Sequence, residues 1–289
     1  MRPLTISAKE LGMEKMNKDT DTQKSALDGS FLIDTHCHLD MPAYAADLDK
    51  VLERAYAQHL KRIITIGVDL QSSKNGIELA RNHKQVSATI GIHPHEVDTL
   101  RDEDYLTLAK IYENQAKHIV GYGEIGLDYY KRYSDPTKQR YHFRRQLDMA
   151  HEFKLPVIIH NREAEDDILS ILRQSQPLDQ GGIMHCFSGD YSYAQRILDL
   201  GMLISIPGII TFKNSITLQE VVMKIPLTSM VLETDGPFLA PQPFRGKRNE
   251  PAYLIRTALK IAELRQIDVS LVAKQTTANA EKLFSFTDQ

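Results

Sequence analysis

Cysteine and tryptophan are scarce in this sequence, and neither sign of charge dominates it. Only two cysteines, Cys37 and Cys186, occur in 289 residues, and tryptophan is absent. Two cysteines cannot build the disulfide framework of a small secreted protein, so a reduced, cytoplasmic setting fits this chain best. The formal net charge of −3 argues against a uniformly basic nucleic-acid-binding face and leaves room only for a local basic rim.

Long apolar segments are missing as well. No run reaches the roughly 18 residues that indicate a membrane-spanning helix, so we expect no membrane partner. The first 30 residues are polar and lack the apolar centre of a secretory signal. We interpret residues 1–30 as a flexible N-terminal extension. A short helix docked on the body is the alternative, and Met13 and Met16 leave a later translation start open.

The body of the chain, residues 31–289, alternates short apolar runs with amphipathic segments. Phe143, Leu147 and Ala150, for example, recur at the spacing of a helix face. Nearly continuous apolar runs are typical of parallel strands that are buried on both faces. Eight such runs occur: FLID, KRIITIGV, VSATIGI, IVGYGEI, LPVIIH, GGIMHC, MLISI and SMVLETD. This alternation predicts an α/β fold, a single (β/α)8 TIM barrel in one domain, with a doubly wound open sheet as the alternative.

Side chains that bind metal ions lie at the predicted ends of these strands. His36 and His38 are two residues apart, so their imidazoles point to the same side of a strand and Cys37 points away. Four further runs end in a candidate ligand, in the order Glu124, His160, His185 and Asp235. The carboxyl ends of the strands form the catalytic face of a (β/α)8 barrel, so we expect these side chains to meet there.

Four histidines and two carboxylates exceed the three protein ligands of a catalytic zinc site. Two ions that share a carboxylate fit better, with His36, His38 and Asp235 on one, His160 and His185 on the other, and Glu124 between them. Two ions about 3.5–4 Å apart can activate a water and stabilise both the attacking and the leaving oxygen. No catalytic triad, P-loop or GxGxxG motif follows a strand, which weighs against acyl-enzyme, nucleotide-triphosphatase and dehydrogenase chemistry.

Eight motifs, in this order, resemble the TatD family of metal-dependent deoxyribonucleases. They are DTHCHLD (34–40), GIHPHE (91–96), GEIGLDYY (123–130), PVIIHNRE (156–163), HCFSG (185–189), GMLISIPGIITFKN (201–214), LETDGPFLAP (232–241) and RGKRNEP (245–251). The resemblance covers residues 31–286 and implies an amidohydrolase-type TIM barrel that hydrolyses phosphodiester bonds in DNA with divalent metals. It implies the same six metal-binding residues. Gly236 and Asn161 depart from the family's pattern, and neither occupies a ligand position.

Other residues are candidates for catalysis or substrate binding. His93 ends the third run and either donates a hydrogen bond to a phosphate oxygen or caps the strand beside Pro94. With Glu124 and Asp235 it forms the predicted catalytic set. We predict that cations at the mouth hold the DNA backbone, namely Arg162, Arg245, Lys247 and Arg248, with Lys213 as a further candidate.

Aromatic and acidic neighbours complete the predicted site. Tyr129, Tyr130 and Phe212 either stack on bases or pack within the protein. Glu233 is expected to share one strand face with Asp235, and to pair with Arg248 or with a metal-bound histidine.

The sequence therefore predicts a hydrolase that cleaves DNA phosphodiesters with water activated by two divalent ions, which are Mg, Mn or Zn. A 3′–5′ exonuclease acting as a monomer on single strands or 3′ ends is the expected form. An amidohydrolase or phosphotriesterase acting on a small molecule is the alternative. Many such enzymes bridge their metals with a carbamylated lysine at the fourth strand, where this chain has Glu124. A barrel that keeps a metal only for stability and serves as a binding module is the non-enzymatic alternative.

Overall fold

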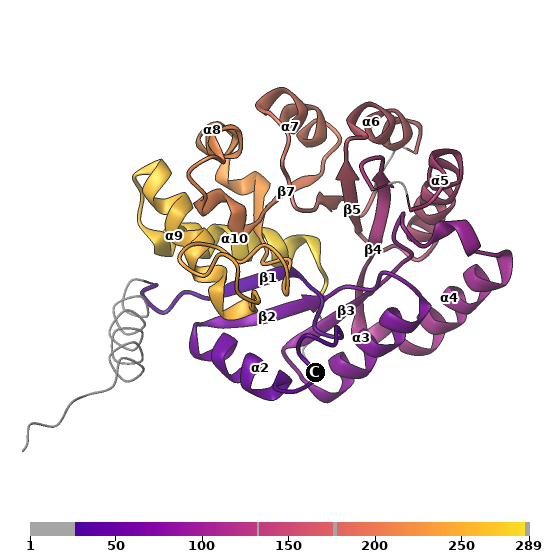
Figure 1. The fold of residues 1–289 in the computed structure, drawn as a ribbon, viewed down its shortest axis with the longest axis horizontal. Coiled ribbons are helices and arrows are strands. Elements are labelled where there is room, and N and C mark those ends of the chain that lie inside the picture. The colour runs from indigo at the N-terminus through magenta and orange to yellow at the C-terminus, as the bar shows by residue number, and fades with distance from the viewer. Residues whose placement is uncertain (1–26, 132, 176–177, 287–289) are drawn as a thin grey trace, which may run out of the picture.

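The computed structural model describes residues 27–131, 133–175 and 178–286, so most of the predicted extension lies outside the described residues. Eight parallel strands form one sheet in the order β1 to β8, with helices around it (Figure 1). They are β1 (Leu32–Cys37), β2 (Leu60–Thr65), β3 (Val86–Ile90), β4 (Ile119–Asp128), β5 (Val157–Arg162), β6 (Gly182–Met184), β7 (Leu203–Ile206) and β8 (Met230–Leu232). A bridge between Cys37 and Gly236 joins β1 to the segment after β8. The predicted TIM barrel is confirmed.

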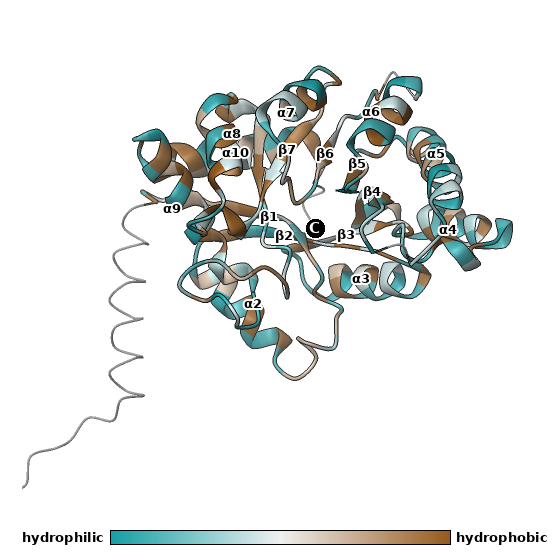
Figure 2. Ribbon diagram, turned by 45° about the horizontal axis from the view of Figure 1, so that its top comes forward, coloured by the Kyte–Doolittle hydropathy of each residue, from teal (hydrophilic) through white to brown (hydrophobic). Residues whose placement is uncertain are grey.

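Amphipathic helices connect the strands on the outside of the barrel. The described α-helices are α2 (Leu48–Ala57), α3 (Leu70–Asn82), α4 (Asp102–Gln115), α5 (Pro136–Glu152), α6 (Glu165–Gln174), α7 (Tyr191–Leu198), α8 (Ile216–Lys224), α9 (Leu254–Arg265) and α10 (Val269–Leu283). Short 3-10 helices span Val97–Thr99, Ala116–His118, Gly208–Thr211, Leu227–Ser229 and Pro251–Tyr253. In Figure 2 single helices carry both hydrophilic and hydrophobic residues, as crossover helices with one buried face do.

Helix α5 illustrates how local sequence fixes these elements. Asp135 precedes the helix and accepts hydrogen bonds from the amides of Thr137 and Lys138, and Pro136 occupies the first turn, where its missing N–H costs nothing. The predicted face of Phe143, Leu147 and Ala150 is buried against the barrel. The helix ends at Glu152.

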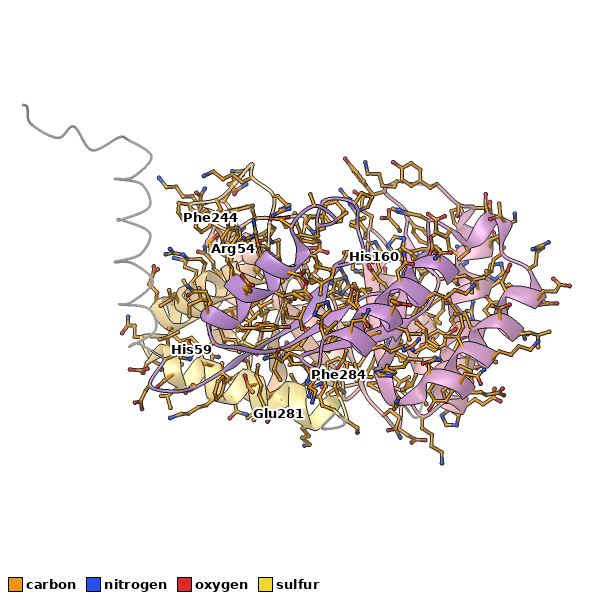
Figure 3. The ribbon with its side chains drawn as sticks, turned by 90° about the horizontal axis from the view of Figure 1, so that it is seen from below. Arg54, His59, His160, Phe244, Glu281 and Phe284 are labelled. Atoms are coloured by element: carbon orange, nitrogen blue, oxygen red, sulfur yellow. The ribbon has the colours of Figure 1, made fainter. Side chains whose placement is uncertain are left out.

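The core has two layers. Strand residues such as Ile33, Ile64, Ile158 and Val231 fill the inside of the barrel together with Phe284, which directly follows α10. A larger cluster lies between the strands and the surrounding helices. In Figure 3, His160 lies toward the opposite end of the barrel from Glu281 and Phe284. The end of the barrel near α10 is therefore filled with apolar side chains.

Leu27 is buried in the core, and residues 27–29 form a turn just before β1. Several strands are shorter or longer than their apolar runs indicated. Glu124 lies in the middle of β4 and His160 lies two residues before the end of β5, whereas His93 and Asp235 lie beyond β3 and β8. No helix within the described residues is long and apolar enough to cross a membrane.

Candidate metal centre

His36, on β1, and His38, just after it, lie on the inside of the barrel's carboxyl end. The Nε2 atoms of His36 and His38 lie 3.3 Å apart. Cys37 points the other way, with its Sγ 3.5 Å from the carbonyl oxygen of Gly236 and 3.9 Å from the Tyr44 hydroxyl. The alternation predicted from the sequence is confirmed. It leaves two buried imidazole nitrogens directed at one point.

Glu124 lies at the centre of the cluster. Its Oε2 is 3.3 Å from His36 Nε2, and its Oε1 is 2.7 Å from His160 Nδ1 and 3.5 Å from His185 Nε2. Glycines bring the neighbouring backbone close on both sides. A Cβ on Gly91 would lie 2.8 Å from the Gly123 backbone, and a Cβ on Gly126, whose φ is +144°, would lie 2.0 Å from a carbonyl oxygen of β5. Side chains at these positions would push Glu124 away from its partners.

His160, on β5, lies between two carboxylates. Its Nδ1 faces Glu124, and its Nε2 is 3.1 Å from Asp128 Oδ2. Asp128 ends β4 and lies on the same side of that strand as Glu124, four residues earlier. The Lys131 amide donates to its other oxygen. A proton on His160 Nε2 donated to Asp128 leaves Nδ1 free to bind a cation.

His185 follows β6 and has a similar arrangement. Its Nδ1 is 3.0 Å from Glu233 Oε2, which also accepts from the Ser205 hydroxyl, while Glu233 Oε1 accepts from the Cys186 amide. Glu233 is fully buried. The prediction that Glu233 pairs with a histidine of the site is confirmed, and the alternative partner, Arg248, is wrong.

Asp235 closes the ring of donors from beyond β8. Its Oδ1 is 3.4 Å from His38 Nε2 and 3.8 Å from His36 Nε2. Its φ of +54° lies in the left-handed region, and its amide donates to the His36 carbonyl. Because the backbone leaves the extended conformation here, Asp235 faces the β1 histidines while Glu233 faces His185. The predicted shared strand face of Glu233 and Asp235 is therefore wrong.

His93 and His95 form the outer edge of the cluster. His93 Nδ1 accepts a hydrogen bond from the His95 amide, which leaves its Nε2, 3.5 Å from Glu124 Oε1, as the protonated nitrogen of a neutral ring. His95 Nε2 is 2.9 Å from Asp128 Oδ2. Asp128 thus orients two rings, His95 and His160, at the mouth of the site.

Burial and mutual charge set the protonation of these groups. Burial and the neighbouring His185 lower the pKa of His36 to about 3, and burial lowers the pKa of His93 to about 4, so both rings are neutral at pH 7. Burial works to raise the pKa of Glu124, but the surrounding histidines hold it well below its usual range. Burial works to lower the pKa of His38, His160 and His185, but the neighbouring carboxylates raise all three, that of His185 to about 10. A divalent ion binds neutral imidazole, so metal binding would release protons from this cluster.

The donor atoms fall into overlapping groups that fit metal ions. Among the described residues, His36, His38 and Asp235 bring three ligand atoms within 4.8 Å of one another, as do His36, Glu124 and His185, and also His93, Glu124 and His160. Cys186 joins His185 and Glu233 in a fourth group. All six predicted ligands therefore meet in one place, with Glu124 shared between groups.

A cavity of about 770 Å³ opens over the donors, a size typical of small-molecule sites. Its lining includes seven predicted site residues: His38, His93, Glu124, His160, Arg162, His185 and Asp235. Lys131, Asn161 and Ser188 belong to or follow β4, β5 and β6, whereas Met41, Val68, Phe238 and Leu239 follow β1, β2 and β8, on the other half of the barrel. The site is accessible, and its wall is partly apolar.

The predicted cations have separate surroundings. Arg162 lines the cavity, and its guanidinium lies 3.9 Å from the centre of the Tyr130 ring. Arg248 binds both oxygens of Asp47, at 2.7 and 2.9 Å, and the carbonyl of Ala43. Its side chain thus holds the loop after β8 against the segment before α2.

The remaining cations lie on exposed loops. Arg245 packs its guanidinium over Phe212 at 4.6 Å, and Lys247 and Lys213 are exposed. Of the cations predicted to bind substrate, only Arg162 lines the described cavity. The Tyr129 hydroxyl bonds to Asp167, so its polar end faces α6.

Sequence reasoning missed Asp128, His95 and Phe238. The period of two along β4 relates Asp128 to Glu124, and GIHPHE carries a second His-x-His pair, so both signals were present in the sequence. Phe238 had no such signal, because a phenylalanine after a strand is as typical of packing as of binding.

Comparisons with known proteins agree with this geometry. A model of the TatD-related DNase family matches residues 33–285. An uncharacterized metal-dependent hydrolase of Bacillus subtilis is 41% identical over 88% of this chain and 98% of its own length. A protein of Erwinia tasmaniensis named 3′-5′ ssDNA/RNA exonuclease TatD is 34% identical over 88% of this chain and all of its own.

Solved structures support the same relationship. A TatD homologue from Escherichia coli K12 superposes with a TM-score of 0.84 at 31% identity, covering 88% of this chain and 98% of its own. An organophosphorus hydrolase from Deinococcus radiodurans reaches a TM-score of 0.56 at 15% identity, covering 90% of this chain and 93% of its own, which is a likeness of fold alone.

Proposed function

This chain belongs to the TatD-related DNase family and is a metal-dependent hydrolase, and we propose that it cleaves phosphodiester bonds at the 3′ end of single-stranded DNA with two divalent ions. The observation that carries this proposal is the position of Glu124. Its two oxygens face different histidines, His36 on one side and His160 and His185 on the other. One carboxylate placed between two groups of imidazoles is the arrangement that a pair of ions requires.

The proposal keeps the division of ligands that the sequence predicts. His36, His38 and Asp235 would hold one ion, His160 and His185 the other, and Glu124 both. When bound, Mg, Mn or Zn ions would acidify a water and offset the negative charge of the phosphate. Hydrogen bonds of His185 to Glu233 and of His160 to Asp128 fix the ring nitrogen that each histidine offers.

His93, which is not a predicted ligand, and Asp235 supply the proton chemistry. His93 Nε2 carries the proton of a neutral ring and points into the cluster, so it can donate to a non-bridging phosphate oxygen. Asp235 lies at the edge of the donor ring and borders the cavity, where its second oxygen can accept a proton from the attacking water. Glu124, His93 and Asp235 are therefore the proposed catalytic residues.

The shape of the cavity favours a single strand. A base inside a duplex cannot reach a cavity of this kind without being unpaired, whereas a strand end can enter directly. Arg162 and Lys131 on the rim would meet the backbone phosphates. The Erwinia relative's name, which specifies 3′–5′ action on single-stranded DNA or RNA, supports the same direction.

The test uses purified, metal-reconstituted protein and a single-stranded DNA labelled at its 5′ end. We expect a ladder that shortens from the 3′ end, no cleavage after chelation, and recovery when Mg, Mn or Zn is restored. The matched strands are an RNA of the same sequence and a duplex with blunt ends. Cleavage that chelation leaves unchanged would overturn the mechanism, and hydrolysis of a dihydroorotate-like amide or a phosphotriester in place of DNA would favour the small-molecule alternative.

A further inference from the structure

The cavity over the metal centre has two unlike walls. Lys131, which follows β4, and Asn161 and Arg162, on β5, contribute polar and cationic residues to its lining. Met41 follows β1, and Phe238 and Leu239 follow the neighbouring β8, so the apolar residues come from the other half of the barrel. Phe238 and Leu239 are 47% and 38% exposed, although both are large hydrophobic residues. Adjacent exposed apolar side chains at the mouth of a site are typical of ligand binding rather than of folding.

The backbone holds this apolar pair in place. The buried side chain of Asn249 donates to the carbonyls of Thr234 and Phe238, both at 2.7 Å, and the Phe238 amide donates to the Asp235 carbonyl. Leu239 has a φ of +55°, a conformation that a leucine adopts at a cost. The loop is therefore fixed so that Phe238 is displayed instead of packed.

Phe238 is also continuous with the metal centre. Its ring centre lies 6.0 Å from that of His38, and the two planes are nearly perpendicular. Phe238 follows the predicted ligand Asp235 by three positions in the sequence. A group that lies against this ring is therefore next to the phosphate that the metal ligands would hold.

The opposite wall identifies the occupant by charge. Arg162 and Lys131 line the cavity, and their cationic groups lie 3.9 and 5.8 Å from the centre of the Tyr130 ring. A ligand that is anionic on one side and flat and apolar on the other fits both walls. Nucleic acid has this character, because its phosphates are anionic and its bases are flat rings that stack on aromatic side chains.

We propose that Phe238, with Leu239 and Met41, forms the platform on which the base next to the scissile phosphate stacks, while Arg162 and Lys131 hold the backbone. This inference rests on the proposed nuclease function and adds the residue that binds the base. Stacking on a phenyl ring does not depend on base identity, so the platform selects strands with an intact 3′-terminal base and tolerates any sequence.

The experiment compares two 5′-labelled single strands, one ordinary and one with an abasic tetrahydrofuran residue at its 3′ end. Phe238→Ala should lower kcat/KM for the ordinary strand by about 5- to 150-fold, mainly through KM. It should leave the abasic strand, which the unchanged enzyme already cuts poorly, nearly unaffected. Phe238→Tyr should restore most of the loss. Leu271→Ala, which removes an apolar side chain of similar exposure from α10, serves as the matched control.

Two results would overturn the platform: an unchanged kcat/KM on the ordinary strand, or equal losses on both strands, which would indicate a merely structural role. If the unchanged enzyme cuts neither strand, the nuclease function fails, and binding decides the platform separately. Fluorescence anisotropy with a phosphorothioate strand should then show weaker binding by Phe238→Ala than by Leu271→Ala. Equal affinities would reject the platform independently of any activity.

Discussion

The two sides of Glu124 are built differently. We define the β1 side as His36, His38 and Asp235, where packing and backbone contacts position the predicted ligands. His36 is fully buried, and its ring centre lies 3.5 Å from that of His185 in a stacked arrangement. The carbonyl oxygen of His36 accepts a hydrogen bond from the Asp235 amide. The Nδ1 atom of His36 has no hydrogen-bond partner among the described residues. On the β5 side, His160 and His185 are each held by a carboxylate, Asp128 or Glu233.

This difference separates two ways to pre-organise a site. Packing fixes the position of an imidazole ring but does not make the ring more basic. A hydrogen bond to a carboxylate raises the basicity of the ring and also fixes its tautomer. We therefore expect changes on the β5 side to affect metal binding with little effect on folding. Changes on the β1 side should affect both.

The largest effect is expected from Glu124→Gln, because it alters the one residue common to both sides. Changes to groups behind a ligand already cost about 10- to 100-fold, so losing the shared carboxylate should lower the cleavage rate by more than about 100-fold. Metal content should fall for both ions, as measured by elemental analysis. Glu96→Gln, at the rim of the same cavity, is the control. Retention of two ions and of the rate would refute the shared role.

Glu233→Gln should have the next largest effect. An amide NH₂ at the position of Oε2 would force His185 Nδ1 to accept, and the proton would move to Nε2, which faces Glu124. We expect a loss near the upper end of the 10- to 100-fold range in metal affinity, with thermal stability nearly preserved. Competition with a chromogenic chelator measures the affinity. An affinity equal to that of the unchanged protein would show that the tautomer does not matter.

Asp128→Asn should act in the same way but less strongly, nearer 10-fold. Asp128 serves two rings, and the side chains of His95 and His160 are 21% and 17% exposed, compared with 5% for His185. Water can therefore replace part of the lost hydrogen bonding. The same chelator competition gives the comparison, and a larger loss for Asp128→Asn than for Glu233→Gln would reverse our ranking.

Asn249→Ala should have the smallest effect on activity and the clearest effect on stability. Its side chain makes three hydrogen bonds that fix the loop carrying Asp235, and losing them should cost about 3 kcal/mol of unfolding free energy at about 1 kcal/mol each. Chemical denaturation of the metal-free protein measures this change. If Asn249→Ala were as stable as Glu233→Gln, the two sides would not differ as described.

Most of the fold and the gathering of the six predicted ligands could be predicted from the sequence, because strand alternation and the common end of parallel strands are local rules. The exact strand ends could not be predicted, since β4 extends four residues past Glu124 and β8 stops three before Asp235. The partner of Arg248 was also unpredictable. Asp47 is 201 residues away in the sequence, and only the folded barrel brings the two together.

Asp128 and Phe238 show two kinds of limit. Asp128 follows Glu124 at the period of two along β4, so a local rule does indicate its position. The position of Phe238 depends on the left-handed backbone of Leu239 and on a hydrogen bond from the buried Asn249 side chain. Its exposure is therefore a property of the folded loop and cannot be predicted from the local sequence.

The closure of β1 against the segment after β8 has a consequence for how the protein matures. His36 leaves the ribosome 199 residues before Asp235, and the ring of donors stays open until the last strand docks beside the first. A nascent or truncated chain therefore offers only scattered imidazoles to the cell's metal pool. Binding of a metal ion by the full set of donors therefore requires a chain that has been synthesised beyond Asp235 and has folded.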